Sequence, residues 1–94
     1  MIRLRIAEAA QQYLRDIRVY SEAAFGTDTA KAYLADLRAA FRLLRERPHI
    51  GSAEADMGEG MRGLSRRSHR IYYLARDEEL LIVRILHHCR NAAV

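Results

Sequence analysis

A nearly continuous apolar stretch, ELLIVRILH at residues 79–87, places the strongest limit on what this chain can fold into. Its aliphatic and β-branched residues are typical of a β-strand. Because successive side chains of a strand point to opposite faces, both faces of this strand are apolar. Strands of that kind lie in the interior of a sheet, with a neighbour on each side. We therefore expect residues 79–87 to form a central strand.

The beginning of the chain predicts one strand and two helices. Residues 2–6, IRLRI, alternate between apolar and basic, which is typical of a half-buried strand. From residue 7 onward apolar residues recur every three or four positions, which predicts an amphipathic helix that ends at Gly26. A second such stripe begins after Thr27 or Asp28 and stops before Pro48. So short a connection forces the two helices into an antiparallel hairpin.

The remaining residues predict a loop and two more strands. Residues 48–60 are rich in glycine and acids and are expected to form a loop. Residues 61–67 and 69–76 form a meander with residues 79–87, with turns at Ser68 and at Asp77 and Glu78. The predicted fold is a single α+β domain over residues 1–94, in the order β-α-α-β-β-β. Its small antiparallel-rich sheet carries an antiparallel helical hairpin on one face.

Basic residues are unevenly distributed along this layout. The net charge is +4, and every one of the 16 basic residues except Lys31 is an arginine. Residues 61–76 contain several arginines and no acid, whereas the preceding loop contains Glu54, Asp56 and Glu59. A cluster of one sign on a sheet face attracts an anionic partner. The alternative is a solvated pair of strands whose arginines are simply exposed, and a GC-rich genome also favours arginine.

The sequence lacks the usual marks of membrane, secreted and cofactor-binding proteins. Its longest apolar run, LLIVRIL, is too short to cross a bilayer and contains Arg84. The first residues form no signal-peptide core, and the single cysteine, Cys89, excludes an internal disulfide, so we expect a cytoplasmic protein. There is no glycine-rich phosphate loop, and we expect no cofactor.

The order of the elements and several short motifs resemble the ParE toxins of the ParE/RelE superfamily. The matching pieces are a helix that ends before Pro48 with Gly51 close behind it, Gly60-Met61-Arg62, His69-Arg70-Ile71-Tyr72-Tyr73, and Val83-Arg84-Ile85-Leu86-His87. The resemblance covers nearly the whole chain.

This resemblance implies the toxin of a bacterial type II toxin–antitoxin pair. It implies a hetero-oligomer with a ParD-like antitoxin, whose ribbon-helix-helix N-terminal part binds DNA, so that the toxin contacts DNA only through its antitoxin. The basic charge of the chain suggests an acidic C-terminal segment on that partner. ParE toxins are associated with inhibition of DNA gyrase, whereas their RelE-like relatives cleave mRNA on the ribosome. One fold serves both activities, so the fold does not choose between them.

Two adjacent histidines near the C-terminus do not form a convincing catalytic or metal site. Alternation places them on opposite faces, His87 with Leu81, Val83 and Ile85, and His88 with Leu80, Ile82, Arg84 and Leu86. RNA cleavage needs an acid, a base and a cation acting together. The spacing of His49, His69 and Cys89 does not match a metal site. We therefore expect no metal and no catalytic residue, and we favour a gyrase inhibitor over a RelE-like mRNA endoribonuclease.

Arg84 is unusual because it interrupts an apolar strand. A buried arginine without a partner is very costly. Either an acid pairs with Arg84, or its face opens to an anionic ligand or a protein partner.

Our hypothesis is that the basic sheet face and the C-terminal tail contact gyrase or are buried by the antitoxin. The contact residues that it names are Arg62, Arg66, Arg70, Tyr72, Arg84, His87, His88 and Arg90. Tyrosine suits interfaces, and the candidate antitoxin anchors on the helices are Tyr13, Tyr20 and Tyr33. All three tyrosines also lie on the apolar stripes, so the alternative is that they belong to the core.

Overall fold

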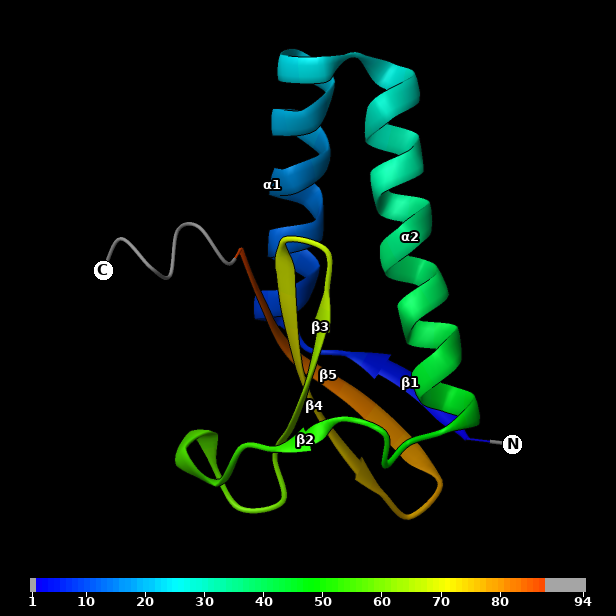
Figure 1. The fold of residues 1–94 in the computed structure, drawn as a ribbon, viewed down its shortest axis with the longest axis vertical. Helices are drawn as coiled ribbons and strands as arrows, with labels where there is room; N and C mark the ends of the chain where they lie inside the picture. The colour runs from blue at the N-terminus through cyan, green and yellow to red at the C-terminus, as the bar shows by residue number, and fades with distance from the viewer. Residues whose placement is uncertain (1, 88–94) are drawn as a thin grey trace.

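The computed structural model describes residues 2–87 and shows two helices packed on one face of a sheet (Figure 1). The elements are β1 (Arg3–Ile6), α1 (Glu8–Phe25), α2 (Thr27–Glu46), β2 (Ser52–Ala53), β3 (Arg62–Arg66), β4 (His69–Arg76) and β5 (Glu79–His87). The strand order across the five-stranded sheet is β1-β5-β4-β3-β2. The predicted α+β class, with its helical hairpin on one face of an antiparallel-rich sheet, is confirmed.

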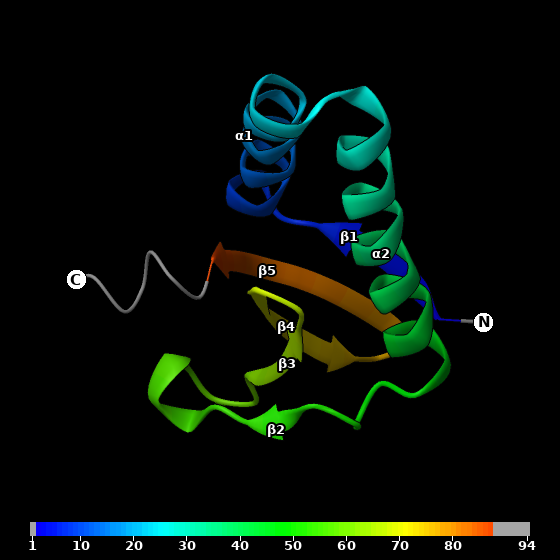
Figure 2. The same ribbon diagram turned by 45° about the horizontal axis from the view of Figure 1, so that its top comes forward.

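The apolar stretch forms β5 in the interior of the sheet, as predicted. It pairs in parallel with β1, where Leu4 lies opposite Leu80, and antiparallel with β4. β3, β4 and β5 form the predicted meander, and the turn between β4 and β5 uses Asp77 and Glu78, both with positive φ. Figure 2 shows the sheet below the two helices, with β1 and β5 nearest to them.

Part of the segment predicted as a loop belongs to the sheet, which corrects the expectation for residues 48–60. Ser52–Ala53 forms β2 and pairs with β3. The Gly51 amide donates a hydrogen bond to the Tyr73 hydroxyl at 2.9 Å, and the Arg62 guanidinium donates to the Gly51 carbonyl at 2.8 Å. A Cβ on Gly51 would lie 2.6 Å from the Tyr73 hydroxyl oxygen, so only glycine fits this approach. These long-range contacts leave no periodic signal in the local sequence.

The helical hairpin covers the sheet with its apolar stripes and then extends beyond it (Figure 1). Side chains from α2 and from β4 and β5 form most of the buried core: Leu34, Leu37, Phe41, Leu44, Ile71, Tyr73, Leu80, Ile82 and Ile85. Near the connection at Gly26 (φ 91°) the stripe of α1 has no sheet to cover, and Tyr20 is 55% exposed. Among the described residues, no helix is long and apolar enough to cross a membrane.

A β-bulge in β5 changes which side chains face the core. Tyr72 pairs with Arg84 whereas Tyr73 pairs with Ile82, so Val83 is an extra residue in β5. Leu80 and Ile82 are buried before the bulge, and Ile85 is buried after it. Strict alternation had placed His87 and Ile85 on the face opposite Leu80 and Ile82, and that prediction is wrong. His87 lies on the helix side, while Arg84 and Leu86 point to the outer face.

His69 is the least expected member of the core. It is 2% exposed, and its ring makes edge-on contacts with Tyr13, Tyr33 and His87 at centroid distances of 5.5, 5.0 and 5.3 Å. Neither ring nitrogen has a hydrogen-bond partner within residues 2–87. Burial, reinforced by the neighbouring His87 and opposed by Asp36, lowers the pKa of His69 from 6.5 to about 4. The folded protein therefore holds this imidazole neutral.

This lowered pKa makes stability depend on pH. Because the unfolded chain binds a proton at His69 more readily than the folded protein, stability falls as the pH drops from about 6.5 toward 4. The loss attributable to His69 is at most about 3 kcal/mol. Urea unfolding at several pH values is expected to show a shallower slope over this range for His69→Phe, which keeps an aromatic ring. An unchanged slope in that variant would assign the pH dependence to other groups.

Candidate functional site

A hollow lies between the two helices and β1. Its volume is about 430 Å³. Apolar side chains form its floor: Leu4, Ile6, Leu14, Leu34 and Phe41. Arginines from both helices form its rim: Arg15, Arg18, Arg38, Arg42 and Arg45. We call this hollow the helical groove.

The rim follows from the spacing of arginines on the helices. On α2, Arg38, Arg42 and Arg45 are four and three residues apart, so they lie along one side of the helix. Arg45 donates two hydrogen bonds to the Ile2 carbonyl, at 3.1 and 3.0 Å, which ties the end of α2 to β1. Neither Arg38 nor Arg42 has an ion pair within the described part of the chain. Positive charge on the α2 side of the groove is therefore left uncompensated.

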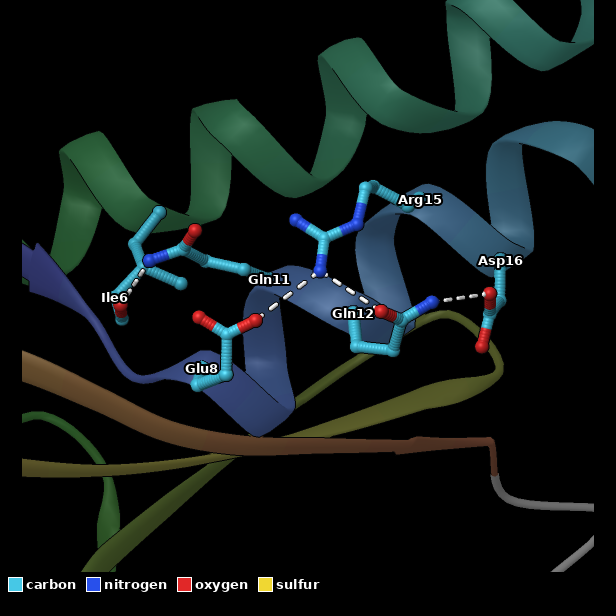
Figure 3. Close-up of polar contacts among 6 residues, drawn as sticks. All are labelled: Ile6, Glu8, Gln11, Gln12, Arg15 and Asp16. Atoms are coloured by element: carbon cyan, nitrogen blue, oxygen red, sulfur yellow. Dashed lines mark hydrogen bonds and ion pairs between the residues drawn. The ribbon is translucent and has the colours of Figure 1, made fainter.

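On α1, one of the rim arginines is held by its own helix. Arg15 contacts Glu8 at 3.2 Å and Gln12 at 2.8 Å, and Figure 3 shows its guanidinium between these two side chains. The close-up also shows Gln11 donating to the Ile6 carbonyl, at 2.7 Å. Arg18, the other rim arginine of α1, has no ion pair among residues 2–87.

The free edge of β1 lies beside the groove. The Arg3 and Ala7 amides donate to the carbonyls of Glu78 and Ile82 at 2.7 and 2.9 Å, so these residues face β5. In a strand the intervening residues face the other way, which directs the amides of Leu4 and Ile6 away from β5. Because β1 is an edge strand of the described sheet, no strand within residues 2–87 pairs with these two amides. Leu4 and Ile6 also line the groove, so the apolar floor and the unpaired backbone meet at one place.

The sheet face opposite the helices, which we call the outer face, holds part of the predicted contact set. Tyr72 and Arg84 are directly paired across β4 and β5 and point to this face. Arg70 lies beside them, with its guanidinium carbon 5.9 Å from the centre of the Tyr72 ring. Arg70 also contacts Glu54 at 2.9 Å and Ser65 at 3.0 Å, so it is held within the fold. Arg84 is exposed and has no ion pair within residues 2–87, so the predicted pairing with an acid is absent among them.

Other members of the predicted contact set lie elsewhere. Arg62 donates to the carbonyls of His49 and Gly51, and Arg66 pairs with Asp36 of α2 at 3.4 Å. His87 packs against His69 on the helix side. His88 and Arg90 lie outside the described residues. The arginines of residues 61–76 therefore do not form one patch, because β3 and β4 direct them to both faces.

The three candidate tyrosines also lie in different environments. Tyr13 and Tyr33 are half-buried against His69, as expected if they belong to the core. Tyr20 is exposed and contacts Phe25 edge-on, so the core alternative is wrong for Tyr20. None of the three lines the groove. The arginine rim was missed, although the stripe Arg38, Arg42 and Arg45 beside the apolar stripe of α2 was a readable signal.

Within the described residues, no three histidine, cysteine or acidic side chains come together in a way that would hold a metal ion. Buried His69 and partly exposed His87 lie on the helix side of the sheet rather than on the outer face with Arg84. Among the described residues, arginines without an ion pair lie beside apolar side chains in the helical groove and on the outer face.

The sequence of this chain is similar to proteins of one known family. Residues 4–92 match the family model described as the ParE toxin of the type II toxin–antitoxin system parDE. Toxin ParE1 of Mycobacterium tuberculosis is 34% identical over 86 residues, which cover 90% of this chain and 88% of that protein.

Solved structures share the fold at lower sequence identity. A structure of the chromosomal ParDE TA system from P. aeruginosa superposes with a TM-score of 0.79 at 19% identity, and covers 93% of this chain and 96% of the other. A conserved hypothetical protein from Helicobacter pylori gives a TM-score of 0.54 at 18% identity, with 95% and 97% covered. Since the family model and the mycobacterial relative both span nearly all of the sequence, this chain belongs to the ParE toxin family of type II toxin–antitoxin systems.

Proposed function

We propose that this protein is a cytoplasmic toxin that inhibits DNA gyrase and is neutralised when a cognate antitoxin occupies the helical groove. The arginine-rimmed, apolar groove is the observation that carries the antitoxin half of this proposal. The gyrase half is supported by membership in the ParE family. The antitoxin is a ParD-like protein with a ribbon-helix-helix N-terminus, so the hetero-oligomer contacts DNA through the antitoxin alone.

The groove fits an amphipathic acidic segment. Its floor of Leu14, Leu34 and Phe41 suits the apolar face of a helix laid between α1 and α2. Arg18, Arg38 and Arg42 supply uncompensated charge along the rim, where carboxylates of the partner would lie. Charge of this kind steers association and favours partners of opposite sign. A disordered antitoxin tail that folds on binding would gain affinity from burying its apolar face on the floor of the groove and from placing its carboxylates at the arginine rim.

The edge of β1 extends the same docking surface. The outward-facing amides of Leu4 and Ile6 lie next to the groove and can accept an additional extended segment by strand addition. The Ile2 carbonyl is already bonded to Arg45 and the Ile6 carbonyl to Gln11. Only a short stretch of β1 is therefore open, and we expect the antitoxin to add a strand of a few residues there.

The described residues offer little support for a ribonuclease. RNA cleavage needs an acid, a base and a cation around one phosphate. On the outer face Arg84 is a cation without an ion pair among residues 2–87, but His69 and His87 lie on the other side of the sheet. His69 is also buried and held neutral by its low pKa. Protein binding is the simpler activity for this arrangement.

Reversing charge on the groove rim is expected to weaken antitoxin binding. The double variant Arg38→Glu/Arg42→Glu should bind the antitoxin encoded by the adjacent gene at least about tenfold more weakly. Because the rim acts electrostatically, its association rate should also depend less on salt. Surface plasmon resonance at several salt concentrations measures both effects.

Lys31→Glu/Arg47→Glu provides the matched control, since it changes the net charge equally but lies outside the groove lining. We expect it to bind with nearly the affinity of the wild type. Equal losses in both double variants would show that the overall charge matters and the groove does not.

Hydrogen exchange tests the β1 edge separately. On antitoxin binding, exchange at the Leu4 and Ile6 amides should slow at least about tenfold, because strand addition gives them hydrogen-bond acceptors. The Arg3 and Ala7 amides, which already donate to β5, serve as internal controls. Residue-resolved NMR exchange on the free toxin and the complex measures this. Unchanged exchange at both Leu4 and Ile6 would restrict the antitoxin to the helices.

Plasmid topology distinguishes the two candidate targets. Induced expression of the toxin should leave plasmids relaxed before protein synthesis declines, and the purified toxin should inhibit supercoiling by gyrase. Parallel measurements of plasmid supercoiling and amino-acid incorporation follow the order of events. If translation stops first and supercoiling persists, the ribosomal mRNA endoribonuclease replaces the gyrase inhibitor.

A further inference from the structure

We propose that the outer face of the sheet, centred on Arg84 and Tyr72, is the surface with which the toxin binds its target. The occupant that it fits is a protein surface presenting a carboxylate among apolar side chains. This inference rests on the proposed function as a toxin, but it assigns the target to a face distinct from the antitoxin groove.

The bulge at Val83 is what places Arg84 on this face. Without the extra residue, the alternation that buries Leu80 and Ile82 would bury residue 84 as well. The bulge instead returns Ile85 to the core and leaves Arg84 exposed. Bulges of this kind re-aim side chains near functional sites. Arg84 makes no ion pair within residues 2–87, so its charge is not neutralised by an acid of the described chain.

Apolar and aromatic side chains surround Arg84 on the outer face. Tyr72 is its direct neighbour across the strands, and Leu86 follows it by two positions on β5. Leu74 and Leu81 lie further along β4 and β5, opposite one another. All four are half-exposed and none belongs to the core or packs against it. An exposed arginine beside a tyrosine, within an apolar surround, has the composition typical of an interface hot spot.

Charge on the outer face favours protein over nucleic acid. Two of its arginines are already paired, Arg70 with Glu54 at 2.9 Å and Arg5 with Glu79 at 3.2 Å. The two glutamates would repel successive phosphates of a polyanion. A nucleic-acid surface gains affinity by neutralising many phosphates. Arg84 with its apolar neighbours instead matches a partner that brings one carboxylate and apolar contacts.

The outer face and the groove are separated by the sheet itself. The groove opens between the helices and β1, whereas Arg84 and Tyr72 point away from the helices. Figure 2 shows the helices on only one side of β4 and β5. A substitution at Arg84 is therefore expected to leave the antitoxin contacts in the groove unchanged.

The test compares Arg84→Gln with Arg3→Gln. Arg3 is also exposed and on the outer face, but it lies at the other end of β5, opposite Glu79. Both variants lose one charge. We would measure growth arrest on induction, inhibition of supercoiling by purified DNA gyrase, affinity for the purified antitoxin, and binding to a single-stranded thymidine oligonucleotide.

Arg84→Gln should lose at least about tenfold in growth arrest and gyrase inhibition. It should keep wild-type antitoxin affinity and thermal unfolding, and Arg3→Gln should behave like the wild type. A second variant, Tyr72→Ala, should share the loss of Arg84→Gln.

Three outcomes overturn the proposal. Undiminished growth arrest by Arg84→Gln would show that the outer face does not bind the target. An equal loss of antitoxin affinity would assign the face to the antitoxin, and a loss of oligonucleotide binding would assign it to nucleic acid. If the wild type leaves gyrase unaffected, the gyrase proposal fails on its own, and the growth-arrest comparison still decides the role of Arg84.

Discussion

The pairing of β5 on both of its edges is the constraint on which the rest of the structure depends. Because β1 and β4 satisfy its backbone, β5 can bury Leu80, Ile82 and Ile85 beneath the helices. Arg84 interrupts this apolar segment, and burying an unpaired guanidinium would cost several kcal/mol of stability. The bulge at Val83 removes that cost by shifting the alternation by one residue. This bulge therefore keeps Ile85 in the apolar core and places the Arg84 side chain on the outer face.

Within residues 2–87 the helices cover one face of the sheet, which leaves this part of the molecule with two unlike surfaces. On the helix side, the arginines surround an apolar groove, and the unpaired edge of β1 lies next to it. On the outer face, half-exposed apolar side chains surround Arg84, which has no ion pair among residues 2–87. In the function that we propose, the first surface binds an acidic antitoxin segment that folds as it binds, and the second binds a preformed protein surface of the target. A toxin that must engage an antitoxin and a target has a use for both.

Periodicity predicted the fold because each element carries its own repeat. The two helical stripes, the strict alternation of IRLRI and the apolar residues of β5 were sufficient for the class and for the interior position of β5. The β2 strand escaped prediction because its pairing depends on Gly51 approaching Tyr73, a contact between distant residues. The face of His87 was wrong for a related reason, since a bulge is set by the partner strand and not by β5 alone. The site residues were harder still to predict, because an arginine is available to a partner only where no acid of the fold already pairs with it.

The arginines illustrate this last point. By composition they are equivalent, yet the fold uses many of them internally. Asp36 forms ion pairs with Arg66 and Arg67, and Glu54 forms one with Arg70. The side chains of Arg45 and Arg62 donate hydrogen bonds to backbone carbonyls. Exposed ion pairs contribute little stability, typically less than about 1 kcal/mol each. Their larger effect is to neutralise these particular arginines, whereas Arg38 and Arg42 on the groove rim and Arg84 on the outer face have no ion pair among residues 2–87. In the function that we propose, the arginines that the fold leaves unpaired contact the partners, and a count of basic residues does not reveal which ones those are.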